Sequence, residues 1–152
     1  MKPDIVAAGN RVVAYQATGS TLATQYPGNR PLVSSIVVGG ANTASPYFFE
    51  MSGTSMAAPL VSGAAALLVQ KDPTLTPDQV KARLMRTAWR GFTKTTNVYD
   101  AVTAQTYTAN HDIFTIGDGQ LDIWAAFNDT NKGSGTAASP SLVYNATNKT
   151  AL

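Results

Sequence analysis

Residues 52–59 contain the most chemically informative serine of the chain, in the sequence SGTSMAAP. A serine at the start of a buried helix lies near unpaired backbone N–H groups and the positive end of the helix dipole. An oxyanion formed beside Ser55 would be stabilised there, as the nucleophile of an acyl transfer requires. Gly53 leaves room for a substrate backbone. The alternative is plain N-capping by Thr54 or Ser55, which residue type alone favours.

Two other side chains could in principle assist Ser55. His111 is the only histidine and lies in an irregular polar segment. A general base must come within hydrogen-bond reach of the hydroxyl, and we expect His111 to be an exposed loop residue instead. Lys71 follows Ser55 by about four helical turns, which is too far for a Ser-Lys dyad along one helix.

Metal and thiol chemistry find little support. The chain has no cysteine, which excludes disulfides, thiolate metal sites and a cysteine nucleophile. Asp112, Asp118 and Asp122 lack the dense alternation of oxygen ligands found in calcium loops. We expect these aspartates to serve turns and helix caps, and no metal site is predicted.

The composition narrows the class of protein. The 152 residues fit one domain or part of one, and only 13% are charged, about half the usual share. A net charge of +2 without a basic run is too weak to indicate nucleic-acid binding. The longest apolar stretch, residues 57–69, is shorter than the roughly 20 residues needed to span a bilayer. We therefore expect neither a nucleic-acid partner nor a membrane.

The elements expected before and around Ser55 are short strands and one long helix. Residues 5–8, 11–15 and 32–38 are predicted strands. Residues 54–70 are apolar or small on every face, which predicts a helix buried on all sides and crossing the middle of the fold. Pro59 cannot donate its backbone hydrogen bond, so we expect a bent or loosely bonded first turn with regular helix from about residue 61.

The second half is predicted to contain two further helices. Thr76-Pro77-Asp78-Gln79 has the residue types of a capping box and predicts a helix beginning there. Residues 90–111 are polar and irregular, and a short helix is expected near residue 121, with Leu121, Trp124 and Ala125 on one face. After residue 128 only residues 141–144 have a strand pattern.

The string GTSMAAP at residues 53–59, followed by VSGAAAL at residues 61–67, resembles the nucleophile segment of subtilisin-like serine proteases, the subtilases of peptidase family S8. Residues 2–9, 75–87 and 119–126 reinforce the resemblance, which covers roughly residues 2–127 in order.

The resemblance implies that Ser55 is the catalytic serine and that its backbone N–H is one oxyanion donor. It places Ser52, Gly53 and Thr54 at the substrate-binding site beside the scissile bond. It also implies an α/β fold, of which this chain would supply late strands of a parallel sheet, a buried central helix after the serine, and C-terminal helices.

The departures from the family pattern are equally informative. In subtilases the triad aspartate, the triad histidine and the oxyanion asparagine precede the serine, so all three are expected before residue 1. Ala8 stands where the family commonly has proline, and residues 10–48 form a longer excursion than compact bacterial members carry. Residues 1–128 are therefore predicted to be the C-terminal portion of a catalytic domain, and residues 129–152 a polar tail or a linker to a further module.

The function expected from the resemblance is that of a serine-type endopeptidase portion, which contributes the nucleophile and is inactive without its upstream part. Its partners would be a polypeptide substrate and that upstream part. No cofactor is expected, although calcium is possible in full-length members of the family. The expected location is secreted or extracytoplasmic.

Two alternatives stay open. One is a catalytically dead scaffold or interaction module that retains the serine turn as a helix cap. The other is a portion of a sedolisin-like serine-carboxyl peptidase, to which residues 56–59 are less similar.

Overall fold

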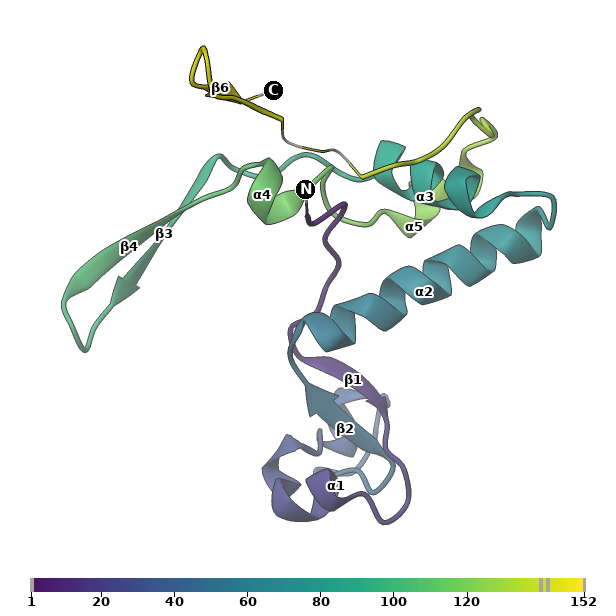
Figure 1. The fold of residues 1–152 in the computed structure, drawn as a ribbon. Coiled ribbons are helices and arrows are strands. Elements are labelled where there is room, and N and C mark those ends of the chain that lie inside the picture. Colours follow the sequence, from purple (N-terminus) through teal and green to yellow (C-terminus); the bar gives the residue numbers. More distant parts are fainter. Residues whose placement is uncertain (1, 140, 142, 152) are drawn as a thin grey trace. The chain divides into compact units, whose positions relative to one another are not determined.

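The computed structural model describes residues 2–139, 141 and 143–151. The chain divides into two compact units, one formed by residues 1–7 with 61–152 and the other by residues 8–60. Helices and strands both occur (Figure 1), as an α/β chain requires.

The unit of residues 8–60 is organised around one antiparallel strand pair. Strand β1 (Val12–Tyr15) pairs with β2 (Phe48–Met51), with Val12 opposite Met51 and Tyr15 opposite Phe48. The strand predicted at residues 11–15 is thus confirmed to within one residue. The β1–β2 connection, residues 16–47, contains helix α1 (Thr21–Gln25) and the 3-10 turns η1 (Pro27–Asn29) and η2 (Val33–Ser35).

The strand predicted at residues 32–38 is wrong. Leu32 makes only an isolated bridge with Ala44, and the N–H groups of Val33 and Ser34 donate to carbonyls across a tight loop, at 2.9 and 3.0 Å. Val38 is fully exposed. The β-branched residues therefore lack a neighbouring strand to pair with and an apolar layer to cover them.

The other unit has its core where two helices meet. Helix α2 (Thr54–Lys71) begins among residues 8–60 and ends in this unit, and it is followed by α3 (Pro77–Arg86). The predicted capping box is confirmed, because Thr76 accepts from the Gln79 N–H while the Gln79 side chain accepts from Thr76. The buried apolar cluster comprises Ala64, Leu68, Leu75, Val80, Leu84 and Ala126.

Helix α2 is not buried on all sides, contrary to the expectation for a central helix. Leu68 is 1% exposed whereas its neighbour Leu67 is 41% exposed, and Leu60 and Val69 are also exposed. The helix is apolar all round, but in the described chain only one face has partners. The helix is continuous from Thr54 to Lys71 although Pro59 lies inside it. The bent or loosely bonded first turn that Pro59 predicts therefore does not break the helix.

The parallel sheet expected from the resemblance is not confirmed. Each sheet formed by the described residues is a two-stranded antiparallel pair. Parallel pairing among them is limited to an isolated bridge between Val6 and Gln120, where a strand was predicted at residues 5–8. Parallel strands are stable when neighbours and covering helices bury both faces, and too few strands are present here to provide that.

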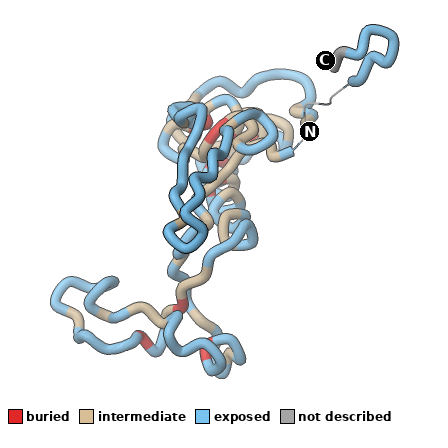
Figure 2. Tube along the Cα trace, turned by 90° about the vertical axis from the view of Figure 1, so that its left-hand side faces the viewer, coloured by how far each residue is buried: buried red, intermediate tan, exposed pale blue. Residues whose placement is uncertain are grey.

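A hairpin occupies the segment predicted to be irregular. Strand β3 (Thr95–Asp100) pairs with β4 (Gln105–Asn110), and nearly every residue of both is exposed (Figure 2). The alternation that identifies a half-buried strand is absent from a hairpin exposed on both faces. No periodic pattern in the sequence therefore indicates this hairpin.

Two short helices follow the hairpin. They are α4 (Ile113–Ile116) and α5 (Ile123–Asn128). The short helix predicted near residue 121 is present as α5, but its predicted face is wrong. Ala126 is 1% exposed and Trp124 is 78% exposed, so the tryptophan points away from the core.

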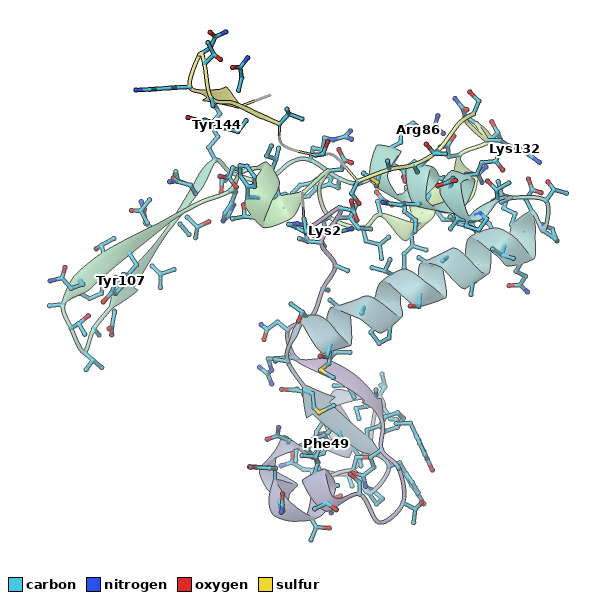
Figure 3. The ribbon with its side chains drawn as sticks, in the orientation of Figure 1. Lys2, Phe49, Arg86, Tyr107, Lys132 and Tyr144 are labelled. Carbon is cyan, nitrogen blue, oxygen red and sulfur yellow. The ribbon has the colours of Figure 1, made fainter. Side chains whose placement is uncertain are left out.

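Residues 129–139 contact helix α3 and the loop before it. Asp129 forms an ion pair with Arg86, and Lys132 forms one with Asp72 at 2.7 Å; Arg86 and Lys132 are labelled in Figure 3. The Ala137 N–H donates to Asp78 at 3.0 Å. The domain boundary predicted after residue 128 stays a prediction.

The chain ends in a third short pair, β5 (Tyr144–Asn145) and β6 (Thr150–Ala151). The strand predicted at residues 141–144 overlaps β5 only at Tyr144, and part of it lies outside the described residues. None of the helices in the described residues combines the length and hydropathy needed to cross a membrane.

Candidate active site

The segment that carries Ser55 is held by a second segment, residues 9–11, within the unit of residues 8–60. Strand β2 ends at Met51, and Ser52 and Gly53 connect it to helix α2. The Ser52 hydroxyl accepts the Arg11 N–H at 2.8 Å and donates to the Asn10 side-chain oxygen at 3.1 Å. The side chain of Ser52 therefore fixes the approach to the helix.

Two glycines meet at this point and permit the close approach. The Gly53 N–H donates to the Gly9 carbonyl at 2.7 Å, and Gly53 has a φ of +153°, which disfavours a side chain. A Cβ atom on Gly9 would lie 2.6 Å from the Gly53 carbonyl oxygen. Larger residues would push the two segments apart.

Ser55 lies in the first turn of α2 and is exposed. The Gly53 carbonyl accepts from the N–H groups of Met56 and Ala57, at 3.0 and 3.3 Å. These two bonds form the first turn of the helix, which contains Ser55. Neither the hydroxyl nor the backbone N–H of Ser55 is hydrogen-bonded to any residue that the structure describes. An exposed hydroxyl beside an unpaired helix N–H is the arrangement expected of a nucleophile with an oxyanion donor.

The interpretation of Thr54 and Ser55 as capping residues has no support in this geometry. Both lie inside the helix rather than before it. Within the described part of the chain, neither hydroxyl accepts a backbone N–H, so neither supplies the bond that defines an N-cap.

Sequence reasoning missed the charged pair that supports this site. Arg11, the residue before β1, donates through Nε to Glu50 on β2 at 2.8 Å. The Glu50 carboxylate raises the pKa of the Arg11 guanidinium. The two residues are 39 positions apart, and no local pattern identifies such a pair before the strand register is known.

The other residues considered for chemistry have structural partners elsewhere. His111 lies in the unit of residues 1–7 and 61–152, where its Nε2 is 3.3 Å from the Thr96 hydroxyl and its ring packs edge-on against Phe92. Lys71 donates to the Phe127 carbonyl and lies over the Phe127 ring.

The three aspartates behave as turn and cap residues, as predicted. Asp112 accepts from the Phe114 and Thr115 N–H groups and caps α4. Asp122 accepts from the Ala125 N–H and caps α5, and Asp118 pairs with Arg90 at 3.6 Å. The described residues contain no group of three or more His, Asp or Glu side chains placed to hold a metal ion.

Comparison with known proteins finds similarity over most of the chain. The model of the subtilase family matches residues 1–119. The chain is 35% identical over 100 residues to the serine protease AprX of Bacillus subtilis, which covers 66% of this chain and 20% of that protein. It is 40% identical over 91 residues to a subtilisin of Bacillus pumilus, covering 57% of this chain and 30% of the subtilisin.

A plant protein is similar to this chain at a comparable level of identity. Subtilisin-like protease SBT2.3 of Arabidopsis thaliana is 36% identical over 88 residues, which cover 58% of this chain and 8% of the plant protein. The chain therefore spans less than a third of the length of each of these three relatives. Because the family model covers most of the sequence, including Ser55, the chain belongs to the subtilase family of serine peptidases.

Proposed function

We propose that this chain is the nucleophile-bearing portion of a subtilisin-like endopeptidase and that Ser55 is its catalytic serine. The observation that carries the proposal is the position of Ser55, exposed in the first turn of α2 with its own N–H unpaired among the described residues. Family membership supports the same role.

The proposed reaction is peptide-bond hydrolysis through an acyl-enzyme. The Ser55 Oγ attacks the scissile carbonyl carbon and gives its proton to a histidine supplied by an upstream part of the domain. The Ser55 N–H donates to the oxyanion together with an upstream asparagine, and the histidine then protonates the leaving amine. Water attacks the ester in the same way, releases the acid and restores the Ser55 hydroxyl.

Residues 52–54 are proposed to bind the substrate backbone beside the scissile bond. The Ser52 hydroxyl is already hydrogen-bonded to Asn10 and to the Arg11 N–H. Gly53 presents no side chain and leaves the approach to Ser55 open. Thr54 is exposed at the start of the helix.

The upstream part is also proposed to complete the fold. It would add the strands that turn the isolated pairings near Val6 into a parallel sheet, and it would cover the exposed apolar residues of α2. Leu60, Leu67 and Val69 are 37%, 41% and 44% exposed, so covering them would remove further apolar surface from water. Secretion is proposed from family membership, and no cofactor is required by the proposed reaction.

The test compares the chain alone with the chain plus a separately produced upstream segment. The chain alone should hydrolyse no peptide, because Ser55 lacks a base and an alcohol is a weak nucleophile at its free pKa. Addition of the upstream segment should produce turnover that is lost in Ser55→Ala. Turnover by the chain alone that required both Ser55 and His111 would contradict the proposal.

If the two parts associate without turnover, the chain is a scaffold rather than an enzyme portion. A requirement for upstream glutamate and aspartate instead of histidine would identify a sedolisin-like peptidase.

A further inference from the structure

A pocket of about 270 Å³ opens beside Ser52 in the unit of residues 8–60. Most of its lining is apolar or aromatic. The lining residues are Leu22, Tyr26, Asn29, Phe49, Met51 and Ser52. A mainly apolar concavity with a few polar groups is the usual form of a ligand site.

The β1–β2 connection supplies half of this pocket. Leu22 lies in α1, and Tyr26 is the first residue after that helix. Phe49 and Met51 lie in β2. Phe49, labelled in Figure 3, is 8% exposed, whereas Leu22 and Tyr26 are 47% and 57% exposed. The pocket thus combines a buried aromatic ring with accessible apolar side chains.

A hydrogen bond fixes the connection against the strand. The Asn29 side-chain nitrogen donates to the Glu50 carbonyl at 3.2 Å. Residues 30–45 are closed off separately, because the Ser45 N–H donates to the Pro31 carbonyl at 2.8 Å and the buried Ser45 hydroxyl accepts from Tyr47 and Phe48. The connection is therefore bonded to β2 at Asn29, which lines the pocket.

Chain geometry places the pocket near Ser55. Ser52 and Ser55 are separated by three peptide units, so their Cα atoms are at most about 11 Å apart, at 3.8 Å per unit. An extended peptide advances about 3.3 Å per residue. A substrate whose scissile carbonyl lies at Ser55 would therefore bring to the pocket a side chain within about three residues of the cleaved bond.

We propose that this pocket selects an apolar substrate side chain within three residues of the cleaved bond, and that Leu22 and Tyr26 determine the selection. The inference rests on the proposed function, because it assumes that a polypeptide approaches Ser55. Apolar side chains are favoured since Leu22, Tyr26, Phe49 and Met51 offer no charge.

A second depression, of about 550 Å³, shares Asn29, Met51 and Ser52 with the pocket but is lined by Arg11, Arg30 and Glu50. This second depression would suit a charged substrate side chain. A preference for a charged peptide over an apolar one would therefore contradict the proposal.

The first experiment measures binding by NMR, with the 152-residue chain and an acetylated tetrapeptide amide that carries one leucine among alanines. Peptide should shift the Leu22 methyl and Tyr26 ring resonances, also in Ser55→Ala. Leu22→Ala and Tyr26→Ala should weaken binding at least fivefold. Val38→Ala is the matched control, because Val38 lies in the same connection, is fully exposed and does not line the pocket.

An aspartate in place of the leucine should weaken binding. Equal binding of the two peptides, or shifts centred on Arg30, would overturn the proposal.

The second experiment measures hydrolysis after the upstream segment is added. Leu22→Ala should reduce the kcat/KM ratio of the leucine peptide to the all-alanine peptide by roughly tenfold, the usual effect of small changes in an apolar pocket. If the enzyme is active and Leu22→Ala leaves this kcat/KM ratio unchanged, the proposed role of the pocket is refuted and the proposed function stands. If Ser55→Ala binds the leucine peptide specifically but the unmutated chain shows no turnover even with the upstream segment, the proposed function is refuted and the role of the pocket in binding stands.

Discussion

The replacement of Leu68 by alanine tests which face of helix α2 is buried. Leu68 is 1% exposed and packs with Ala64, Leu75 and Leu84 in the core of its unit. Leu67 is its neighbour on the same helix and is 41% exposed. The two leucines have the same chemistry and the same helix propensity, so Leu67→Ala is a matched control.

The expected losses differ by about 2 kcal/mol. Leu68→Ala removes three buried carbon atoms at about 0.8 kcal/mol each, and the cavity left behind raises the total to roughly 3 kcal/mol. Leu67→Ala removes a side chain that already contacts water and leaves no enclosed cavity, so about 1 kcal/mol is expected.

Urea unfolding followed by circular dichroism gives the two free energies of unfolding. Leu68→Ala should lower the midpoint strongly with an unchanged slope, and Leu67→Ala should lower it slightly. Equal losses would refute the one-sided burial of α2 in this chain. If the upstream part covers the exposed face as proposed, the cost of Leu67→Ala should rise after that part is added.

Three further changes test other parts of the same unit. Thr76→Ala removes the hydroxyl that caps α3 and should lower the free energy of unfolding by about 1 kcal/mol, measured by urea titration against Thr106→Ala, an exposed threonine of β4, as the control. Hydrogen bonds from Lys132 and Thr74 lower the pKa of Asp72 from 3.8 to about 2, so Asp72→Asn should be less stable than the wild type above about pH 4, and the difference should vanish as the pH falls below about 2. A pH-independent difference would contradict that linkage. Deletion of residues 129–152 should cost about 1 kcal/mol, since exposed ion pairs contribute roughly 0–1 kcal/mol each, and an unchanged urea midpoint would identify the segment as a linker.

Local signals in the sequence were sufficient for elements whose structure is decided within a few residues. The Thr76–Gln79 box predicts the start of α3 because both of its hydrogen bonds join residues three apart. The helix that follows Ser55 was predicted almost to the residue, since small and apolar residues continue for five turns. Asp112 and Asp122 were predicted to cap or turn for the same local reason.

The sequence could not show which elements would find partners. The β-branched run at residues 32–38 has strand propensity, but propensity forms a strand only where another strand accepts its hydrogen bonds. The hairpin β3–β4 shows the converse, because its pairing stabilises two polar strands without a buried face. Trp124 is the largest residue of α5, yet the smaller Ala126 packs against the core.

For the candidate site, residue types by themselves favoured a helix cap at Thr54 or Ser55, and only the resemblance of residues 53–67 to a known segment made Ser55 the candidate nucleophile. Only the tertiary structure brought Asn10 and Arg11 to Ser52, Gly9 to Gly53, and the β1–β2 connection to β2. These contacts join residues 21 to 44 positions apart, and such pairs depend on the register of β1 against β2. The sequence determined which groups could react, whereas long-range backbone pairing decided which groups surround them.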